Sequence, residues 1–206
     1  MTRRSFFSNL RNNCEASTAG EFALVLPILI LFLLGIVDVG RTMWLINTAE
    51  KATQIGARMA VVTDMVPGGL YAENYGATLG QGAAIPLTSF GAARCNKPTT
   101  TVSCDCLTTP CPTLTPLDAP AFEAIVSRMR QISSIIGASN VEIVYANSGL
   151  GYAGDPNGAD VAPLVTVTAR NLSFTPLLFQ IFGASFALPP VSASLTMEDG
   201  VGDKYN

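Results

Sequence analysis

The sequence predicts an α+β fold, in which one long N-terminal transmembrane helix leads into a small antiparallel sheet with a packed helix. The first observation is an uncharged apolar run from Phe22 to Val37. The second is the alternation of apolar and polar residues in 141–145, 164–169 and 191–197, which is typical of half-buried strands. The third is a helical spacing of apolar residues over 120–136.

The apolar run near the N-terminus is expected to cross a membrane. It holds sixteen residues without a charge, and apolar character resumes in Met43–Ile46. A spanning helix needs about 20 residues, a length that ends near Asp38 when it starts at Ser17. With the apolar residues that follow, we assign residues 17–46 to the transmembrane helix. The alternative is a cleaved secretory signal, but such a signal has a shorter apolar stretch that ends in a small-residue cleavage site, which this run lacks.

The charges around this helix predict its orientation. Arg3, Arg4 and Arg11 precede it, which favours a cytoplasmic N-terminus under the positive-inside rule. The chain would then be a single-pass inner-membrane protein with a periplasmic domain. At the far end of the span, Asp38 is expected to reach the interface and to pair with Arg41 one turn on.

The composition argues against an enzyme and against nucleic-acid binding. The chain contains no histidine, which removes the usual general base of hydrolases and the commonest ligand of catalytic zinc. It also lacks G-x-S-x-G, G-x-x-x-x-G-K-[ST] and any G-x-G-x-x-G that opens a helix after a predicted strand. Residues 47–206 hold eight Lys and Arg against twelve Asp and Glu, so no basic surface for phosphates is expected. We expect no catalytic residue, no cofactor and no metal.

Four of the five cysteines follow the membrane helix and lie within one stretch of 17 residues, namely Cys95, Cys104, Cys106 and Cys111. On an oxidising side of the membrane, an even set favours two disulfides, for which three pairings are possible. Zinc is the alternative, but the spacing lacks the C-x2-C pairs of zinc sites. Cys14 precedes the span and lies on the reducing side.

Two further stretches, residues 45–63 and 68–118, can be interpreted from the spacing of apolar residues in the first and the composition of the second. Helical spacing continues from Leu45 to about Thr63, so the membrane helix is expected to extend beyond the bilayer. Residues 68–118 are rich in Gly, Thr and Pro, and we expect an irregular, loop-dominated region held by the cysteines near 95–111.

Residues 172–188 are apolar enough to raise the question of a second span. Pro176, Gln180 and Gly183 interrupt them, which favours an amphipathic or core-covering segment, with contact to the membrane surface as its functional variant. The run D-P-N-G-A-D at 155–160 resembles a calcium loop, but it lacks alternating ligands and a closing glutamate. We interpret it as part of a hairpin excursion.

Several runs of residues together resemble TadE-like proteins, the minor pseudopilins of tight-adherence (Flp-type) pili. Near the N-terminus these are A-S-T-A-G-E-F-A-L-V-L-P at 16–27 and N-T-A-E-K-A-T-Q-I-G-A-R-M-A at 47–60. Near the C-terminus they are V-T-V-T, F-T-P-L-L and S-A-S-L-T-M-E-D within 161–199. The resemblance implies a pilin-like domain in residues 47–206 and a structural role in assembling or initiating such a pilus.

The resemblance also implies processing by a prepilin peptidase. In the family the opening reads approximately G-x-x-x-x-E-[FY], with the cut after the glycine and the glutamate fifth in the mature chain. Glu21 and the residue after it match the last two positions, which places the cut between Ala16 and Ser17, with alanine where the family usually has glycine. Residues 1–16 would then be a cytoplasmic leader. A cut after Gly20 and no cut at all are the alternatives.

Glu21 would act as the assembly carboxylate. It is either solvated at the cytoplasmic interface or paired with a positive group, such as the α-amino group of Ser17 on its own or a neighbouring subunit. The implied partners are the inner membrane, the prepilin peptidase, other pilins or pseudopilins and the pilus assembly platform. The rival interpretation is a membrane-anchored periplasmic binding or adhesin module, whose loop near 95–111 contacts a ligand.

Overall fold

The structure is a computed structural model that describes residues 14–156, 158–180 and 185–197, and it divides into two compact units. Unit 1 comprises the chain up to Met43 together with Phe174–Phe186. Unit 2 comprises Trp44–Ser173 and the chain from Ala187 onward.

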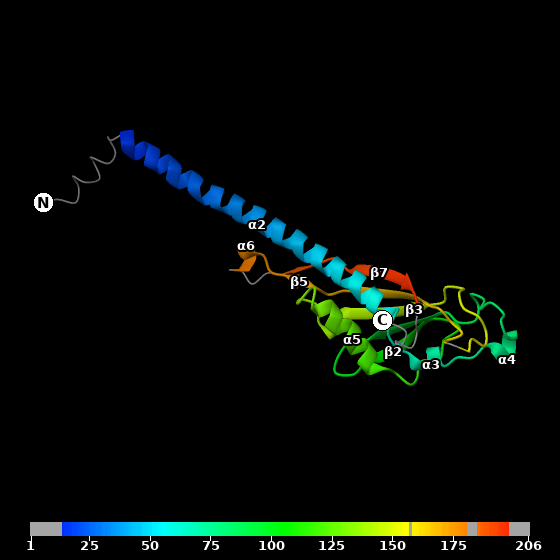
Figure 1. The fold of residues 1–206 in the computed structure, drawn as a ribbon. Helices are drawn as coiled ribbons and strands as arrows, with labels where there is room; N and C mark the ends of the chain where they lie inside the picture. Colours follow the sequence, from blue (N-terminus) through cyan, green and yellow to red (C-terminus); the bar gives the residue numbers. More distant parts are fainter. Residues whose placement is uncertain (1–13, 157, 181–184, 198–206) are drawn as a thin grey trace. The chain divides into compact units, whose positions relative to one another are not determined.

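One helix, α2 (Cys14–Ala60), runs for 47 residues and belongs to unit 1 in its first part and to unit 2 in its last part. It is the long blue-to-cyan helix in Figure 1. Pro27 lies inside it and removes one backbone donor, yet the helix continues on both sides. The predicted helical continuation beyond Leu45 is confirmed, and α2 is about 70 Å long at 1.5 Å per residue. It ends at Ala60, three residues before the expected Thr63.

Unit 2 is built on a five-stranded antiparallel sheet with the strand order β2-β1-β3-β4-β7. The strands are β1 (Ala92–Asn96), β2 (Ser103–Thr108), β3 (Val141–Ala146), β4 (Leu164–Ala169) and β7 (Val191–Thr196). The three strands predicted from alternation are confirmed to within one residue at each end. The fold class, an α+β fold with a long N-terminal apolar helix, a small antiparallel sheet and a packed helix, is confirmed as well.

The expectation of a loop-dominated region over 68–118 is wrong for the two strands β1 and β2. Strand β1 is central, since it pairs with β2 on one side and with β3 on the other. Strand β2 is an edge strand, mostly exposed, and so it carries little of the apolar alternation that reveals a strand in the sequence. Two one-turn helices also lie in this region, α3 (Gly68–Tyr71) and α4 (Gly76–Leu79).

Helix α5 (Ala119–Arg130) begins as predicted and ends six residues early. The carboxylate of Asp118 accepts the N–H of Ala121 at 2.8 Å, which caps the first turn. After Arg130 the chain tightens into a turn, because the N–H groups of Ile132 and Ser133 both donate to the carbonyl of Met129. The two serines at 133 and 134 favour such turns over helix. Ile136, expected on the helix, lies beyond it but is fully buried.

The core of unit 2 lies where α5 and the last part of α2 pack on the same face of the sheet. Gly56 of α2 marks the closest approach, since a Cβ there would lie 2.7 Å from the Sδ of Met129 and 3.4 Å from a methyl of Val167. Alanines at 49, 52, 57 and 60 extend this buried strip of small side chains along α2. Small residues therefore let the helix approach both α5 and strand β4 closely.

Tyr145 is the largest fully buried side chain of the sheet core. Its hydroxyl oxygen accepts the N–H of Val66 at 3.3 Å. Burial raises the pKa of Tyr145 well above its ordinary value, so the phenol stays neutral at physiological pH. This bond ties the chain just after α2 to the centre of the sheet.

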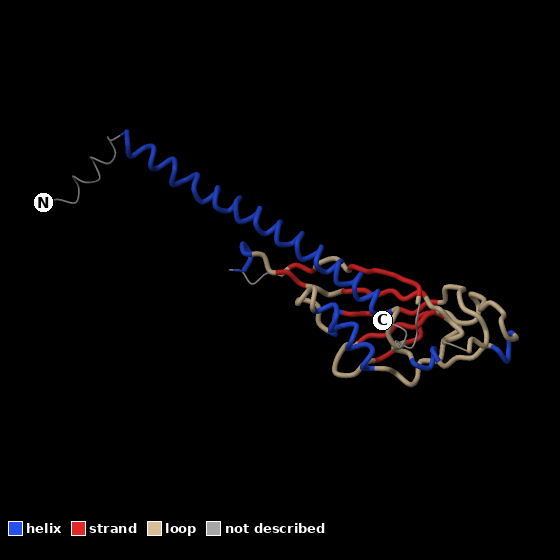
Figure 2. The backbone as a smooth tube through the Cα atoms, in the orientation of Figure 1, coloured by secondary structure: helices blue, strands red, loops and turns tan. Residues whose placement is uncertain are grey.

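Several long loops of unit 2 gather at one end of the sheet (Figure 2). Residues 147–163 connect the neighbouring antiparallel strands β3 and β4, which agrees with the predicted hairpin excursion. The carboxylate of Asp160 accepts the N–H of Tyr75 at 2.6 Å and that of Asp155 at 3.0 Å. Gly151 has φ +118°, and a Cβ there would lie 2.1 Å from the carbonyl oxygen of Asp160, so the turn requires glycine. The carboxylate of Asp160 therefore joins the loop that contains Tyr75 to the loop between β3 and β4.

The described residues of 172–188 form two short strands and a one-turn helix. Strand β5 (Ser173–Phe174) pairs with β6 (Phe186–Ala187), and helix α6 (Leu177–Gln180) lies between them in the chain. Residues 181–184, which include Gly183, lie outside the described residues. Among the described residues, α2 is the one helix that is long and apolar enough to cross a membrane.

Candidate functional site

The candidate site is the part of α2 that belongs to unit 1. Its most apolar 18-residue stretch has a mean hydropathy of 2.8, and almost none of it is buried within the chain. Large apolar side chains are exposed on every side of the helix, among them Phe22, Leu24, Val25, Ile28, Leu29, Leu31, Phe32, Leu33, Ile36 and Val39. A helix that is apolar all round and is not covered by its own chain is typical of a membrane span.

Glu21 stands at the N-terminal end of this apolar surface and is exposed. Within the described part of the chain, its carboxylate makes no hydrogen bond and no ion pair. Ala16 and Ser17, the predicted cleavage positions, lie in the first turn of α2. Residues 1–13 of the predicted leader, with its three arginines, lie outside the described residues.

Asp38 stands at the other end of the apolar run and is 7 % exposed. Its Oδ1 accepts the N–H of Leu177 at 2.8 Å, and its Oδ2 accepts the N–H of Leu178 at 3.1 Å. The Nη1 of Arg41 lies 3.4 Å from Oδ1, so the predicted pairing of Asp38 with Arg41 is confirmed. The two amide donors were not predicted, because they lie about 140 residues further along the chain.

Arg41 makes a second contact within unit 1. Its guanidinium carbon lies 5.2 Å from the centroid of the Phe174 ring, which is cation–π geometry. We call Asp38, Arg41, Phe174 and the two amides of Leu177 and Leu178 the Asp38 cluster. It fastens the short helix α6 to α2 through charge-assisted hydrogen bonds, which are about twice as strong as neutral ones.

The two carboxylates of the apolar helix, Asp38 and Glu21, therefore differ in whether they have partners within the described residues. An unpaired charge near the centre of a bilayer costs about 2.5–3.5 kcal/mol on insertion scales. Asp38 offsets that cost within its own chain, through an arginine and two amides. Glu21 has no such partner among the described residues, so its capacity to accept hydrogen bonds is open to water or to another molecule.

The structure contains two disulfides, Cys95–Cys104 and Cys106–Cys111. The sequence alone allowed three pairings of these four cysteines. Cys95 on β1 and Cys104 on β2 are directly opposed across the two strands, and Cys95 is fully buried. Cys106 and Cys111 are both exposed, and their bond closes the turn that follows the edge strand β2. Cys14 is the first residue of α2.

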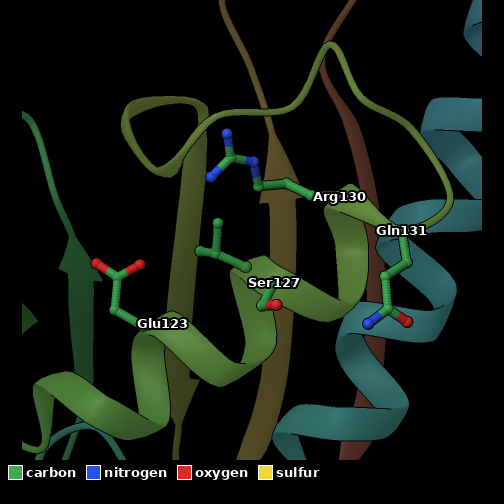
Figure 3. A pocket seen from close by; sticks show the side chains of 5 residues that line it. Glu123, Ser127, Arg130 and Gln131 are labelled. Atoms are coloured by element: carbon green, nitrogen blue, oxygen red, sulfur yellow. The ribbon is translucent and has the colours of Figure 1, made fainter.

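A shallow surface hollow of about 300 Å³ lies along α5 (Figure 3). Figure 3 shows Glu123, Ser127 and Arg130 projecting from this helix and Gln131 from the position that follows its last residue. Glu123 forms an ion pair with Lys97, which already satisfies its charge. Within the described residues, no three His, Cys, Asp or Glu side chains gather in an arrangement that could hold a metal ion. The hollow therefore has the character of an ordinary solvated helix surface.

Taken together, these features are those of an α+β protein with one exposed apolar helix, consistent with a single-pass membrane anchor. Residues 16–58 match the family model described as TadE-like protein, which confirms the resemblance over that stretch. The match takes in Ala16, Ser17, Glu21 and Asp38 and ends two residues before the end of α2. Neither the curated proteins nor the solved structures contain a match to the chain.

Proposed function

We propose that this protein is a minor pseudopilin that takes part in the assembly or initiation of a tight-adherence (Flp-type) pilus. The observation that carries the proposal is Glu21, an exposed carboxylate without a described partner at the inner end of a TadE-like apolar helix. When this helix packs beside others, a pair between this carboxylate and a positive group specifies how far one helix is shifted along its neighbour.

In the proposed mechanism the helix first lies in the inner membrane of a Gram-negative cell, with the N-terminus cytoplasmic and the domain periplasmic. A prepilin peptidase removes residues 1–16 and exposes the amine of Ser17. Glu21 lies four residues on, about 6 Å along the helix and on nearly the same side. Its carboxylate then accepts hydrogen bonds from the amine of Ser17 on its own or a neighbouring subunit, which offsets the desolvation of both charges.

No residue of this chain is proposed as catalytic. The protein is a substrate of the peptidase, and its other partners are pilins or pseudopilins and the pilus assembly platform. The apolar surface of α2, which lipid covers before assembly, is the surface that other helices would cover afterwards.

Mass analysis of the intact protein, extracted from membranes with detergent, tests the processing step. We expect a chain that begins at Ser17, and we expect the variant Ala16→Phe to keep Met1 because a bulky side chain blocks the peptidase. The variant Glu21→Ala should still be cut, since its carboxylate acts after the cut. Recovery of the wild-type chain with Met1–Cys14 intact would contradict the proposal, and a start at Glu21 would move the cut to Gly20.

The rival function is a membrane-anchored periplasmic binding or adhesin module. It is supported by the exposed turn that the Cys106–Cys111 disulfide closes at the edge of the sheet. Such a module needs no leader cleavage and no charge at position 21. The processing measurement therefore separates the two functions.

A further inference from the structure

The Phe174–Phe186 segment stands out because it is part of unit 1, although its neighbours in the sequence belong to unit 2. Its described residues contribute to β5, make the single turn of α6 and contribute to β6. What holds it against the apolar helix is the Asp38 cluster, with two amide bonds, an ion pair and a cation–π contact.

The position of Asp38 along α2 sets the depth of this segment in a membrane. Asp38 is 17 residues beyond Glu21, a distance of about 25 Å along the helix. The hydrocarbon core of a bilayer is about 30 Å thick. If Glu21 lies at one interface, Asp38 therefore lies close to the other, and Arg41, whose side chain is 45 % exposed, lies one turn further out.

The segment has the chemistry of a membrane interface rather than of a water-exposed loop. Its sequence P-L-L-F-Q-I-F at 176–182 contains one polar side chain, and no charge. Leu177 and Phe186 are 38 % and 50 % exposed. The free N–H groups of a helix start are costly near hydrocarbon, and the carboxylate of Asp38 satisfies two of them.

We propose that the described residues of this segment, 174–180 and 185–186, form a membrane-interface foot. It lies in the headgroup region of the leaflet at the outer end of the span, with the side chain of Leu177 facing the acyl chains, and Asp38 holds it to α2. Its partner is the lipid surface. This inference requires only that α2 crosses a bilayer. A result against the pseudopilin function would therefore leave it unchanged, and a result against the foot would leave the pseudopilin function unchanged.

Fluorescence quenching by brominated lipids tests the foot. Trp44 is the single tryptophan, so Trp44→Phe gives a silent background for one introduced probe. The full chain with Leu177→Trp is reconstituted into phosphatidylcholine bilayers brominated at different acyl positions. We expect strong quenching and a depth of about 5–10 Å into the interface.

The matched control carries Tyr152→Trp in the same background, because Tyr152 is an exposed residue in a loop of unit 2. We expect its emission to be unaffected by brominated lipid. Equal quenching at positions 177 and 152, whether both weak or both strong, would overturn the proposal, since the foot would then be no closer to lipid than an ordinary loop.

Hydrogen exchange in nanodiscs tests the role of Asp38 in holding the foot. In the wild-type protein we expect the amides of Leu177 and Leu178 to be protected. Asp38→Leu should raise exchange in peptides that cover 174–180, Asp38→Asn should raise it less, and Glu21→Gln should leave it unchanged. Unchanged protection in both Asp38 variants would show that the carboxylate does not hold the segment.

Discussion

Replacing Glu21 with alanine is expected to abolish most pilus assembly while the protein continues to be made, inserted and cut. Truncating one partner of a desolvated, hydrogen-bonded charge pair costs about 2–5 kcal/mol, much of it from the charge left unpaired. The lower figure corresponds to pairing weakened about 30-fold. Pili per cell, counted by electron microscopy, should therefore fall about tenfold or more.

The control for this substitution is Glu50→Ala, which removes an exposed carboxylate from the same helix, beyond the apolar stretch. It should leave pili near their wild-type number. Glu21→Gln keeps the shape and one acceptor but loses the charge, and it should give an intermediate count. Wild-type piliation in Glu21→Ala cells, with the mature protein present in their membranes, would contradict the role of this carboxylate.

The largest expected loss of stability follows from Phe122→Ala. Phe122 is fully buried on the face of α5 that packs toward the core of unit 2. Removing a buried aromatic ring costs about 3–5 kcal/mol, from lost transfer energy and the cavity that remains. In a domain of this size the Tm should fall by about 6–20 °C, which thermal unfolding of the full chain in detergent measures by circular dichroism.

The matched substitution on the same helix is Ser127→Ala, because Ser127 is exposed. It should change stability by no more than about 0.5 kcal/mol. If the two variants unfolded at the same temperature, Phe122 would not be part of the cooperative core.

Much of the fold could be predicted from local pattern. The apolar run of α2, the alternation in β3 and β4, and the apolar face of α5 are each encoded within one short stretch. Strands β1 and β2 could not be predicted in this way. Strand β1 reads A-A-R-C-N, and it becomes a strand because two partners flank it, with Cys95 opposed to Cys104 on one side and to Ile143 on the other.

In the candidate site, too, the contacts within one helix could be predicted from the sequence, whereas the contacts between distant segments could not. The i,i+3 pairing of Asp38 with Arg41 follows from helix geometry, and the sequence predicts it. The bonds from the amides of Leu177 and Leu178 depend on the chain returning to α2 more than 130 residues later. Backbone donors carry no residue-specific signal, so no motif in the sequence could have revealed that Asp38 fastens a second segment.

Fractionation combined with thiol labelling tests the topology on which both proposals depend. We expect the protein in the membrane fraction after alkaline carbonate washing, released by detergent, with Cys95, Cys104, Cys106 and Cys111 unreactive until a reductant is added. These cysteines form the two disulfides of the domain that follows the helix. A soluble cytosolic chain in which all four thiols react without reductant would contradict a single-span protein with its domain on the oxidising side.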